Sequence, residues 1–315
     1  MTPFAFRPDA RLSRAPRSDW PQRRAPARLR APLIPWDASE FRINRGSWHR
    51  DFPSVVNDRD SCLPFLRRKR TAQRRLFCFP YAGSGASVFH GWSRLLPDDI
   101  EMCAVQLPGR ETRLADAPVP DVRLLAAMLA DELASYLDLP FAFYGHSFGA
   151  LVAFELAVRL GPAIPLRHLF AAACPAPHLP RPELWIDDLP DEQFITTLRR
   201  YGGTPEVVLR DRELMEVLGP TIRADLHAYA TYAYEPRPRL ACPITAVGGA
   251  QDLGVTRRQL DEWHSHTTGR FGVFIVPGNH FFLATSGPAV AERVCELFAD
   301  RARSMPRTAV AHDES

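Results

Sequence analysis

A serine between two glycines is the clearest chemical signal in the chain. Ser147 lies in the sequence G-H-S-F-G at 145–149, after an apolar run at 141–144 and before a helical pattern at 149–160. A G-x-S-x-G sequence between a strand and a helix is typical of a sharp turn that exposes the serine hydroxyl near a helix N-terminus. The glycines are needed because larger side chains would collide across this turn. We therefore predict that Ser147 is a nucleophile.

A serine nucleophile needs a base and an acid that orients the base. His280 follows the last expected strand, and of the ten histidines it is the only one directly after a late strand. In the chain order that accompanies this turn, the acid lies in the loop after the preceding strand. Asp252 lies in that loop and is our predicted acid, and Asp261 and Glu262 in the following helical pattern are the alternatives.

Acyl transfer also needs donors for a developing oxyanion. One donor in this arrangement is the N–H of the residue after the nucleophile, which is Phe148 here, and the other comes from the loop after an early strand. The sequence Y-A-G-S-G at 81–85 follows such a strand. We predict that the backbone N–H groups of Ala82 and Phe148 form the oxyanion hole.

Apolar runs that alternate with helical patterns must position these residues. The expected strands are 75–80, 101–107, 141–144, 168–174, 244–247 and 271–276, and the clearest helices are 149–160, 287–299 and one capped by Asp121. This alternation predicts an α/β fold with a mostly parallel sheet flanked by helices. Between 176 and 238 the alternation lapses and apolar residues recur at helical spacing. We expect a mobile helical lid there, over the carboxyl edge of the sheet.

Composition excludes several classes of protein. The 315 residues are 46% hydrophobic and 24% charged, which excludes collagen, a coiled coil and wholesale disorder. No apolar run approaches the ~18 residues of a membrane span, and no secretory signal opens the chain. The six cysteines show no metal-ligand spacing, so we expect reduced thiols in the cytoplasm and neither a metal nor an organic cofactor.

The first 70 residues differ from the rest. They carry 16 Lys and Arg against 7 Asp and Glu, and they hold 9 of the 30 prolines. Such a stretch buries too little apolar surface to offset its ordering entropy. We expect a disordered extension at 1–70, a folded unit at 71–303 and a polar tail at 304–315. The basic arm could contact nucleic acid, a membrane or an acidic protein, but we favour a solvated tail and predict no nucleic-acid or membrane partner.

Four motifs occur in an order that identifies a family resemblance. They are FPYAGSGA at 79–86, LPGRE at 107–111, GHSFGA at 145–150 and PGNHFF at 277–282. In these motifs the chain resembles the type II thioesterases, which are stand-alone α/β-hydrolases that accompany polyketide synthases and nonribosomal peptide synthetases. The resemblance covers about residues 76 to 297. Phe148 stands where the family usually has methionine, and Asn279 stands where it usually has glycine.

The resemblance implies an activity and a partner. It implies hydrolysis of acyl groups from the phosphopantetheine arm of acyl or peptidyl carrier proteins, an editing role in antibiotic and other secondary metabolism. It gives Ser147, His280 and Asp252 the roles of nucleophile, base and acid. A carboxylesterase or lipase acting on free esters is the alternative, because these residues do not distinguish oxygen from sulfur leaving groups. A non-catalytic binding module is less favoured because all three residues are present.

Overall fold

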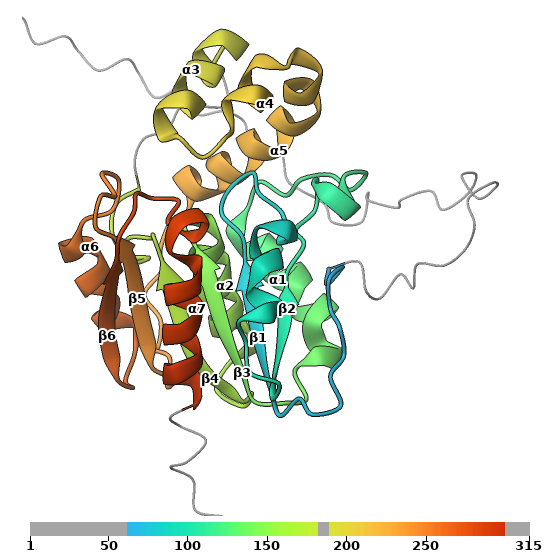
Figure 1. Cartoon of the computed structure of the whole chain (residues 1–315). Helices are drawn as coiled ribbons and strands as arrows, with labels where there is room; N and C mark the ends of the chain where they lie inside the picture. The colour runs from blue at the N-terminus through green and yellow to red at the C-terminus, as the bar shows by residue number, and fades with distance from the viewer. Residues whose placement is uncertain (1–61, 182–188, 300–315) are drawn as a thin grey trace, which may run out of the picture. The chain divides into compact units, whose positions relative to one another are not determined.

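The computed structural model describes residues 62–181 and 189–299. Its centre is a parallel sheet of six strands in the order β2-β1-β3-β4-β5-β6 (Figure 1). The strands are β1 (Arg74–Phe79), β2 (Ile100–Ala104), β3 (Phe141–His146), β4 (Leu166–Ala172), β5 (Ile244–Gly249) and β6 (Phe271–Val276). Because the strands are parallel, their carboxyl ends share one edge of the sheet, where the following loops can meet.

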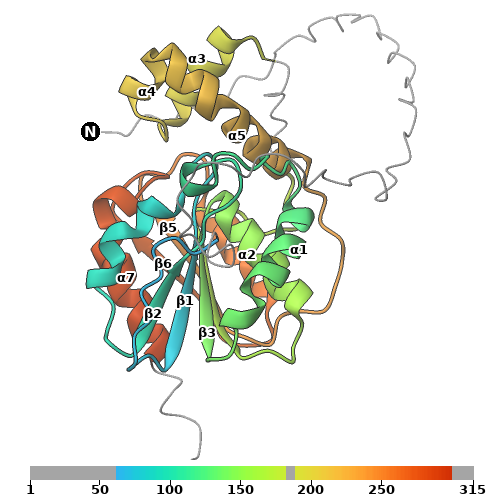
Figure 2. The same cartoon turned by 90° about the vertical axis from the view of Figure 1, so that its right-hand side faces the viewer.

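Helices cover both faces of the sheet, which is why its central strands are apolar on both sides. All six residues of β3 are buried. One face packs against η1 (Ala86–Arg94) and α7 (Leu283–Ala299), and the other packs against α1 (Val122–Leu133) and α2 (Phe148–Leu160) (Figure 2). The short helices are η2 (Glu111–Arg113), η3 (Ala134–Tyr136), α6 (Arg257–Asp261) and η4 (Glu262–His266). The predicted α/β fold with a parallel sheet is confirmed.

Three helices interrupt the alternation between β4 and β5. These lid helices are α3 (Asp191–Tyr201), α4 (Glu206–Arg210) and α5 (Arg212–Thr231), and they lie beyond the carboxyl edge of the sheet (Figure 1). They share a small core of their own, which consists of Phe194, Leu198, Leu209, Met215 and Ile222. The helical insertion expected from the sequence is therefore present, although 182–188 lie outside the described residues.

The folded unit begins earlier than residue 71, the position expected from composition. Cys62 and Leu63 are buried in the same core cluster as α1 and α2. The N–H of Lys69 donates to Glu101 Oε1 at 2.9 Å, and Gln106 N–H donates to Cys62 O at 2.8 Å. The described end of this basic, proline-containing stretch, from residue 62 onward, therefore packs against the core. The rest of the expected extension, and the tail at 304–315, lie outside the described residues.

Hydropathy along the helices bears on membrane association. Within 62–181 and 189–299, no helix is both long enough and apolar enough to cross a membrane.

Candidate active site

The turn between β3 and α2 presents Ser147 in a strained backbone conformation. Its φ is 52° and its ψ is −116°, a region that costs energy for a residue with a side chain. Its N–H donates to Ala172 O of the neighbouring strand β4 at 2.7 Å. A Cβ on Gly145 would overlap the backbone of Gly149 and Ala150. The glycine spacing is therefore a steric requirement of this turn.

Three loops at the carboxyl edge of the sheet bring together the three side chains selected from the sequence. His280 follows β6, Asp252 follows β5 and Ser147 follows β3. His280 Nε2 lies 2.9 Å from Ser147 Oγ, and His280 Nδ1 lies 2.9 Å from Asp252 Oδ2. This geometry allows the imidazole to accept the hydroxyl proton at Nε2 while Nδ1–H donates to the carboxylate.

The carboxylate of Asp252 is held by its own loop. Its side chain is 1% exposed, and Oδ1 accepts from the N–H groups of Gly254 at 2.8 Å and Val255 at 3.1 Å. Burial by itself raises the pKa of Asp252, but the hydrogen bond and charge of His280 and these two amides outweigh it, so the pKa is lowered. The residue is therefore a carboxylate at neutral pH.

The two alternative acids lie elsewhere. Asp261 lies on the surface of α6, where its carboxylate pairs with Arg257 at 3.0 Å. Glu262 lies 3.6 Å from His178 Nε2, in a separate cluster. Neither is placed against His280, so only Asp252 is positioned to orient it among the three candidates.

The two predicted oxyanion donors lie at the start of α2, directly after the serine, and in the loop after β1. Phe148 is the first residue of α2, so no helix carbonyl accepts from its N–H. The loop with Ala82 follows β1, which pairs with β3 so that Phe79 is opposite Gly145. Within the described residues no acceptor takes the Ala82 N–H. Neither hydrogen-bond pattern conflicts with the predicted role of these two amides as oxyanion donors, which stays a prediction.

His146 has a structural role that the sequence did not predict. Its Nε2–H donates to the backbone oxygen of His280 at 2.7 Å, and its Nδ1 lies 3.4 Å from the Tyr144 hydroxyl. Burial, together with the charge of His280, lowers the pKa of His146 to about 3. The neutral ring therefore anchors the backbone of the base. Its place next to the serine, inside the G-x-S-x-G sequence, was the available signal.

Phe281 is a second residue near the site that the sequence did not predict, and the turn after α3 packs against it. Phe281, next to His280, packs its ring edge against Tyr81 at a centroid distance of 5.1 Å. A Cβ on Gly203, in the turn after α3, would overlap the Phe281 ring. The turn and the ring thus fit closely only because residue 203 has no side chain. The contact between Gly203 and Phe281 is visible only in the folded structure, because the two residues are far apart in the sequence.

Within the part of the chain that the structure describes, no group of three or more His, Cys, Asp or Glu side chains is placed to hold a metal ion. The chemistry that this arrangement supports is proton transfer and nucleophilic attack by protein side chains.

Comparisons with known proteins show the family of the chain. The model of the thioesterase domain family matches residues 74–301. The gramicidin S biosynthesis protein GrsT of Aneurinibacillus migulanus is 44% identical over 227 residues, which cover 71% of this chain and 89% of that protein.

Solved structures extend the comparison to the fold. RedJ, a thioesterase from the prodiginine pathway of Streptomyces coelicolor, is 37% identical with a TM-score of 0.68, over 72% of this chain and 91% of its own. The type II thioesterase BorB from the borrelidin biosynthetic cluster is 36% identical with a TM-score of 0.69, over 78% of this chain and 100% of its own. The chain therefore belongs to the thioesterase family, and it is an enzyme with the α/β-hydrolase fold.

Proposed function

We propose that this protein is a type II thioesterase that hydrolyses acyl groups from the phosphopantetheine arm of carrier proteins. The observation that carries the proposal is the line of Ser147, His280 and Asp252, with 2.9 Å between each pair of contacting atoms, in a chain of the thioesterase family. RedJ belongs to the prodiginine pathway and BorB to the borrelidin cluster. These relatives support an editing role, in which stalled acyl groups are removed so that an assembly line can continue.

The first half of the reaction forms an acyl-serine. Ser147 Oγ attacks the thioester carbonyl carbon while its proton moves to His280 Nε2. Asp252 stabilises the imidazolium, and the N–H groups of Ala82 and Phe148 stabilise the tetrahedral oxyanion. The carbon–sulfur bond then breaks. Because a thiol has a pKa of about 8.5, the pantetheine sulfur leaves readily and takes its proton from His280.

The second half returns the enzyme to its starting state. Neutral His280 removes a proton from water as the water oxygen attacks the ester of Ser147. The same two amides stabilise the second oxyanion. Its collapse breaks the bond to Oγ, which recovers the proton from the imidazolium and releases the carboxylic acid. Every proton transfer uses one histidine, so the proposed mechanism needs no cofactor.

The proposed partner is an acyl or peptidyl carrier protein, and the proposed compartment is the cytoplasm, where cysteines remain reduced. Pathway membership of the relatives supports this kind of partner.

Mass spectrometry of an acyl-loaded carrier protein tests the proposal. We expect the wild-type protein to restore the mass of the free phosphopantetheine form and Ser147→Ala to leave the acyl group in place. The matched control is Ser93→Ala, because the Ser93 side chain is exposed on the outer side of η1 and donates only to His90 O. Rapid hydrolysis of p-nitrophenyl esters without release from the carrier would instead identify a carboxylesterase. Inactivity on both substrates would favour a non-catalytic scaffold.

A further inference from the structure

A carboxylate of the lid helices is buried against the loop that follows β1. The Asp225 side chain of α5 is 0% exposed. Its Oδ2 accepts from Gly83 N–H at 2.7 Å and from Arg110 Nη1 at 2.5 Å, and its Oδ1 accepts from Arg110 Nη2 at 2.8 Å. Removing one member of a buried ion pair leaves an uncompensated charge, so the three groups form one unit.

The same face of α5 fits two glycine turns of the core. A Cβ on Gly83 would lie 2.7 Å from Ile222 Cγ1, and one on Gly109 would lie 2.7 Å from Thr221 Oγ1. The Thr221 hydroxyl also donates to Gly109 O at 2.5 Å. Because Thr221, Ile222 and Asp225 fall within about one helical turn, they form a single docking face. This face of α5 is therefore anchored to the core by hydrogen bonds and close packing.

Arg110 extends the anchor to the C-terminal end of the loop. Its Nη1 also donates to Ser84 O at 3.3 Å, and its own backbone oxygen accepts from Gln106 Nε2 at 3.1 Å. The Oε1 of Gln106 accepts from the N–H of Ala86 at 3.1 Å. The turn after β1 is thus tied to the core on one side and to Asp225 on the other.

The tied segment is a turn whose central peptide has two possible orientations. Ser84 N–H donates to Tyr81 O at 3.0 Å, and Gly83 has a φ of 75°. A positive φ at the third position is the requirement of a type II turn. Type I and type II turns differ by a flip of the peptide that joins the central residues, here Ala82 and Gly83. An acceptor for the Gly83 N–H selects one orientation.

We propose that Asp225 is a positioning residue for the oxyanion hole: paired with Arg110, its carboxylate accepts the Gly83 N–H and so fixes the turn that carries Ala82, the proposed oxyanion donor. The proposal rests on the proposed function only in that Ala82 donates to the oxyanion. An oxyanion donor is effective only within about 2.7–3.1 Å of the developing charge, so a small shift of the turn slows the reaction. A residue of the lid helices thereby supports acyl transfer without touching the substrate.

Two double variants isolate the hydrogen bond from the ion pair. Arg110→Met/Asp225→Asn keeps an acceptor oxygen for Gly83, whereas Arg110→Met/Asp225→Leu has none, and neither leaves a buried guanidinium unpaired. We expect the leucine variant to have a kcat about ten- to a hundredfold lower than the asparagine variant, with KM changed less than threefold. An alkyl trifluoromethyl ketone, which forms an oxyanion adduct with serine, should bind the leucine variant more weakly by the same factor.

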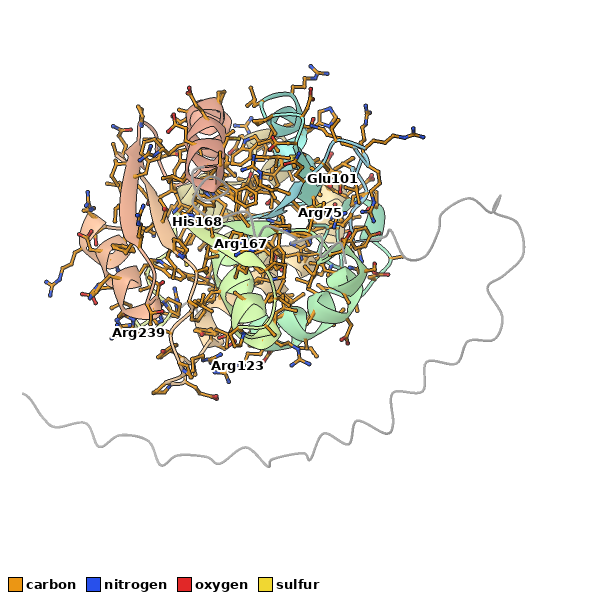
Figure 3. All side chains as sticks on the ribbon, turned by 90° about the horizontal axis from the view of Figure 1, so that it is seen from below. Arg75, Glu101, Arg123, Arg167, His168 and Arg239 are labelled. Carbon is orange, nitrogen blue, oxygen red and sulfur yellow. The ribbon has the colours of Figure 1, made fainter. Side chains whose placement is uncertain are left out.

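The control is a second buried pair, far from the site, whose carboxylate also accepts from one arginine and one backbone amide. Glu101 accepts from Arg75 Nε at 2.7 Å and from Lys69 N–H at 2.9 Å. Figure 3 shows this pair in the view from below, at the end of the sheet away from the lid helices. Arg75→Met/Glu101→Leu should lower the melting temperature without changing kcat or the affinity for the ketone.

The outcomes separate the two proposals. Equal kcat and equal ketone affinity in the two Asp225 variants overturn the positioning role, as does a loss confined to KM. If the leucine variant does not fold, hydrogen exchange at the Gly83 amide of the wild-type protein decides: exchange as slow as in α2 supports the role, and exchange as fast as in an exposed loop overturns it. A wild-type protein that hydrolyses only p-nitrophenyl esters overturns the proposed function alone, and the variants are then compared on the ester.

Discussion

Asp252 shows what a single residue needs in order to act as the acid. The acid must be ionised, fixed in direction and in contact with the imidazole. Asp252 meets all three conditions because two amides hold Oδ1 while Oδ2 faces His280 Nδ1. Asp261 pairs with an arginine on an exposed helix instead. The distinction between the two is one of surroundings, since their chemistry is identical.

Replacing each aspartate with asparagine tests this assignment. Asp252→Asn should lower kcat by about 10³- to 10⁴-fold, because an amide stabilises neither the required tautomer of His280 nor the imidazolium. Asp261→Asn should leave kcat within about twofold, since a surface ion pair contributes little. Steady-state kinetics on an acyl thioester, with circular dichroism to verify folding, is the measurement. Comparable losses in both variants would contradict the assignment.

At the scale of elements, the turn after α3 and the loop after β6 form a contact over the site. Gly203 lies against the Phe281 ring, and Phe281 in turn packs on Tyr81. The contacts of the lid helices with the core thus include two of different character. The Asp225 contact is polar and buried, whereas the Phe281 contact is apolar and requires a glycine at position 203.

Adding one methyl group tests the apolar contact. Gly203→Ala should lower the free energy of unfolding by about 1–3 kcal/mol because the new Cβ overlaps the ring. The same change in a Phe281→Ala background should cost about 1 kcal/mol less, which is the coupling expected for residues in contact. Urea unfolding measures both. The control is Gly272→Ala in β6, where a Cβ meets open space; additive effects of the two substitutions would exclude the contact.

At the scale of the whole molecule, the stretch before β1 contributes to stability. Leu63 is 2% exposed although it lies in a basic, proline-containing segment. Leu63→Ala should lower the free energy of unfolding by about 2–5 kcal/mol, since it leaves a cavity in the core. Phe65→Ala, two residues away at a 36% exposed position, should cost clearly less. Equal small effects in chemical denaturation would place residues 62–65 outside the core.

Two buried histidines make the free energy of unfolding depend on pH in the acidic range. Burial and the charge of His280 lower the pKa of His146 to about 3, and burial and the charge of His178 lower the pKa of His266 to about 4. Below about pH 6.5, the ordinary histidine value, the unfolded chain therefore binds more protons than the folded protein. The free energy of unfolding should fall from pH 6.5 towards pH 4, by up to about 1.4 kcal/mol per pH unit for each histidine.

One substitution checks this origin of the acid sensitivity. His266→Gln should make the loss of stability between pH 6.5 and pH 4 less steep, because one proton-binding difference is removed. The control is His264→Gln, at an exposed position of the same helix: of the contributions to the lowered pKa of His266, the charge of His264 is the smallest, so this variant should change the slope less. Thermal unfolding across this pH range gives both slopes, and an unchanged slope in His266→Gln would contradict the explanation.

The sequence by itself predicted the main strands and helices and selected Ser147 as the proposed nucleophile. Apolar runs such as 141–144 and the glycines at 145 and 149 act within a few residues, so they are visible in the order of amino acids. The base followed from its place after the last expected strand. These features depend on local periodicity and on the steric needs of one turn, which adjacent residues alone impose.

Only the tertiary structure decided which distant groups serve that nucleophile. The sequence favoured Asp252 over Asp261, but the contact of Asp252 with His280 is visible only in the fold. Asp225 lies in a helix that the sequence placed in the lid, and its contact with Gly83 was not predicted. Leu63 likewise belongs to the core although its neighbours in sequence are basic and polar. Contacts of this kind join residues far apart in the chain, and their partners are chosen by packing and burial, which composition and periodicity do not encode.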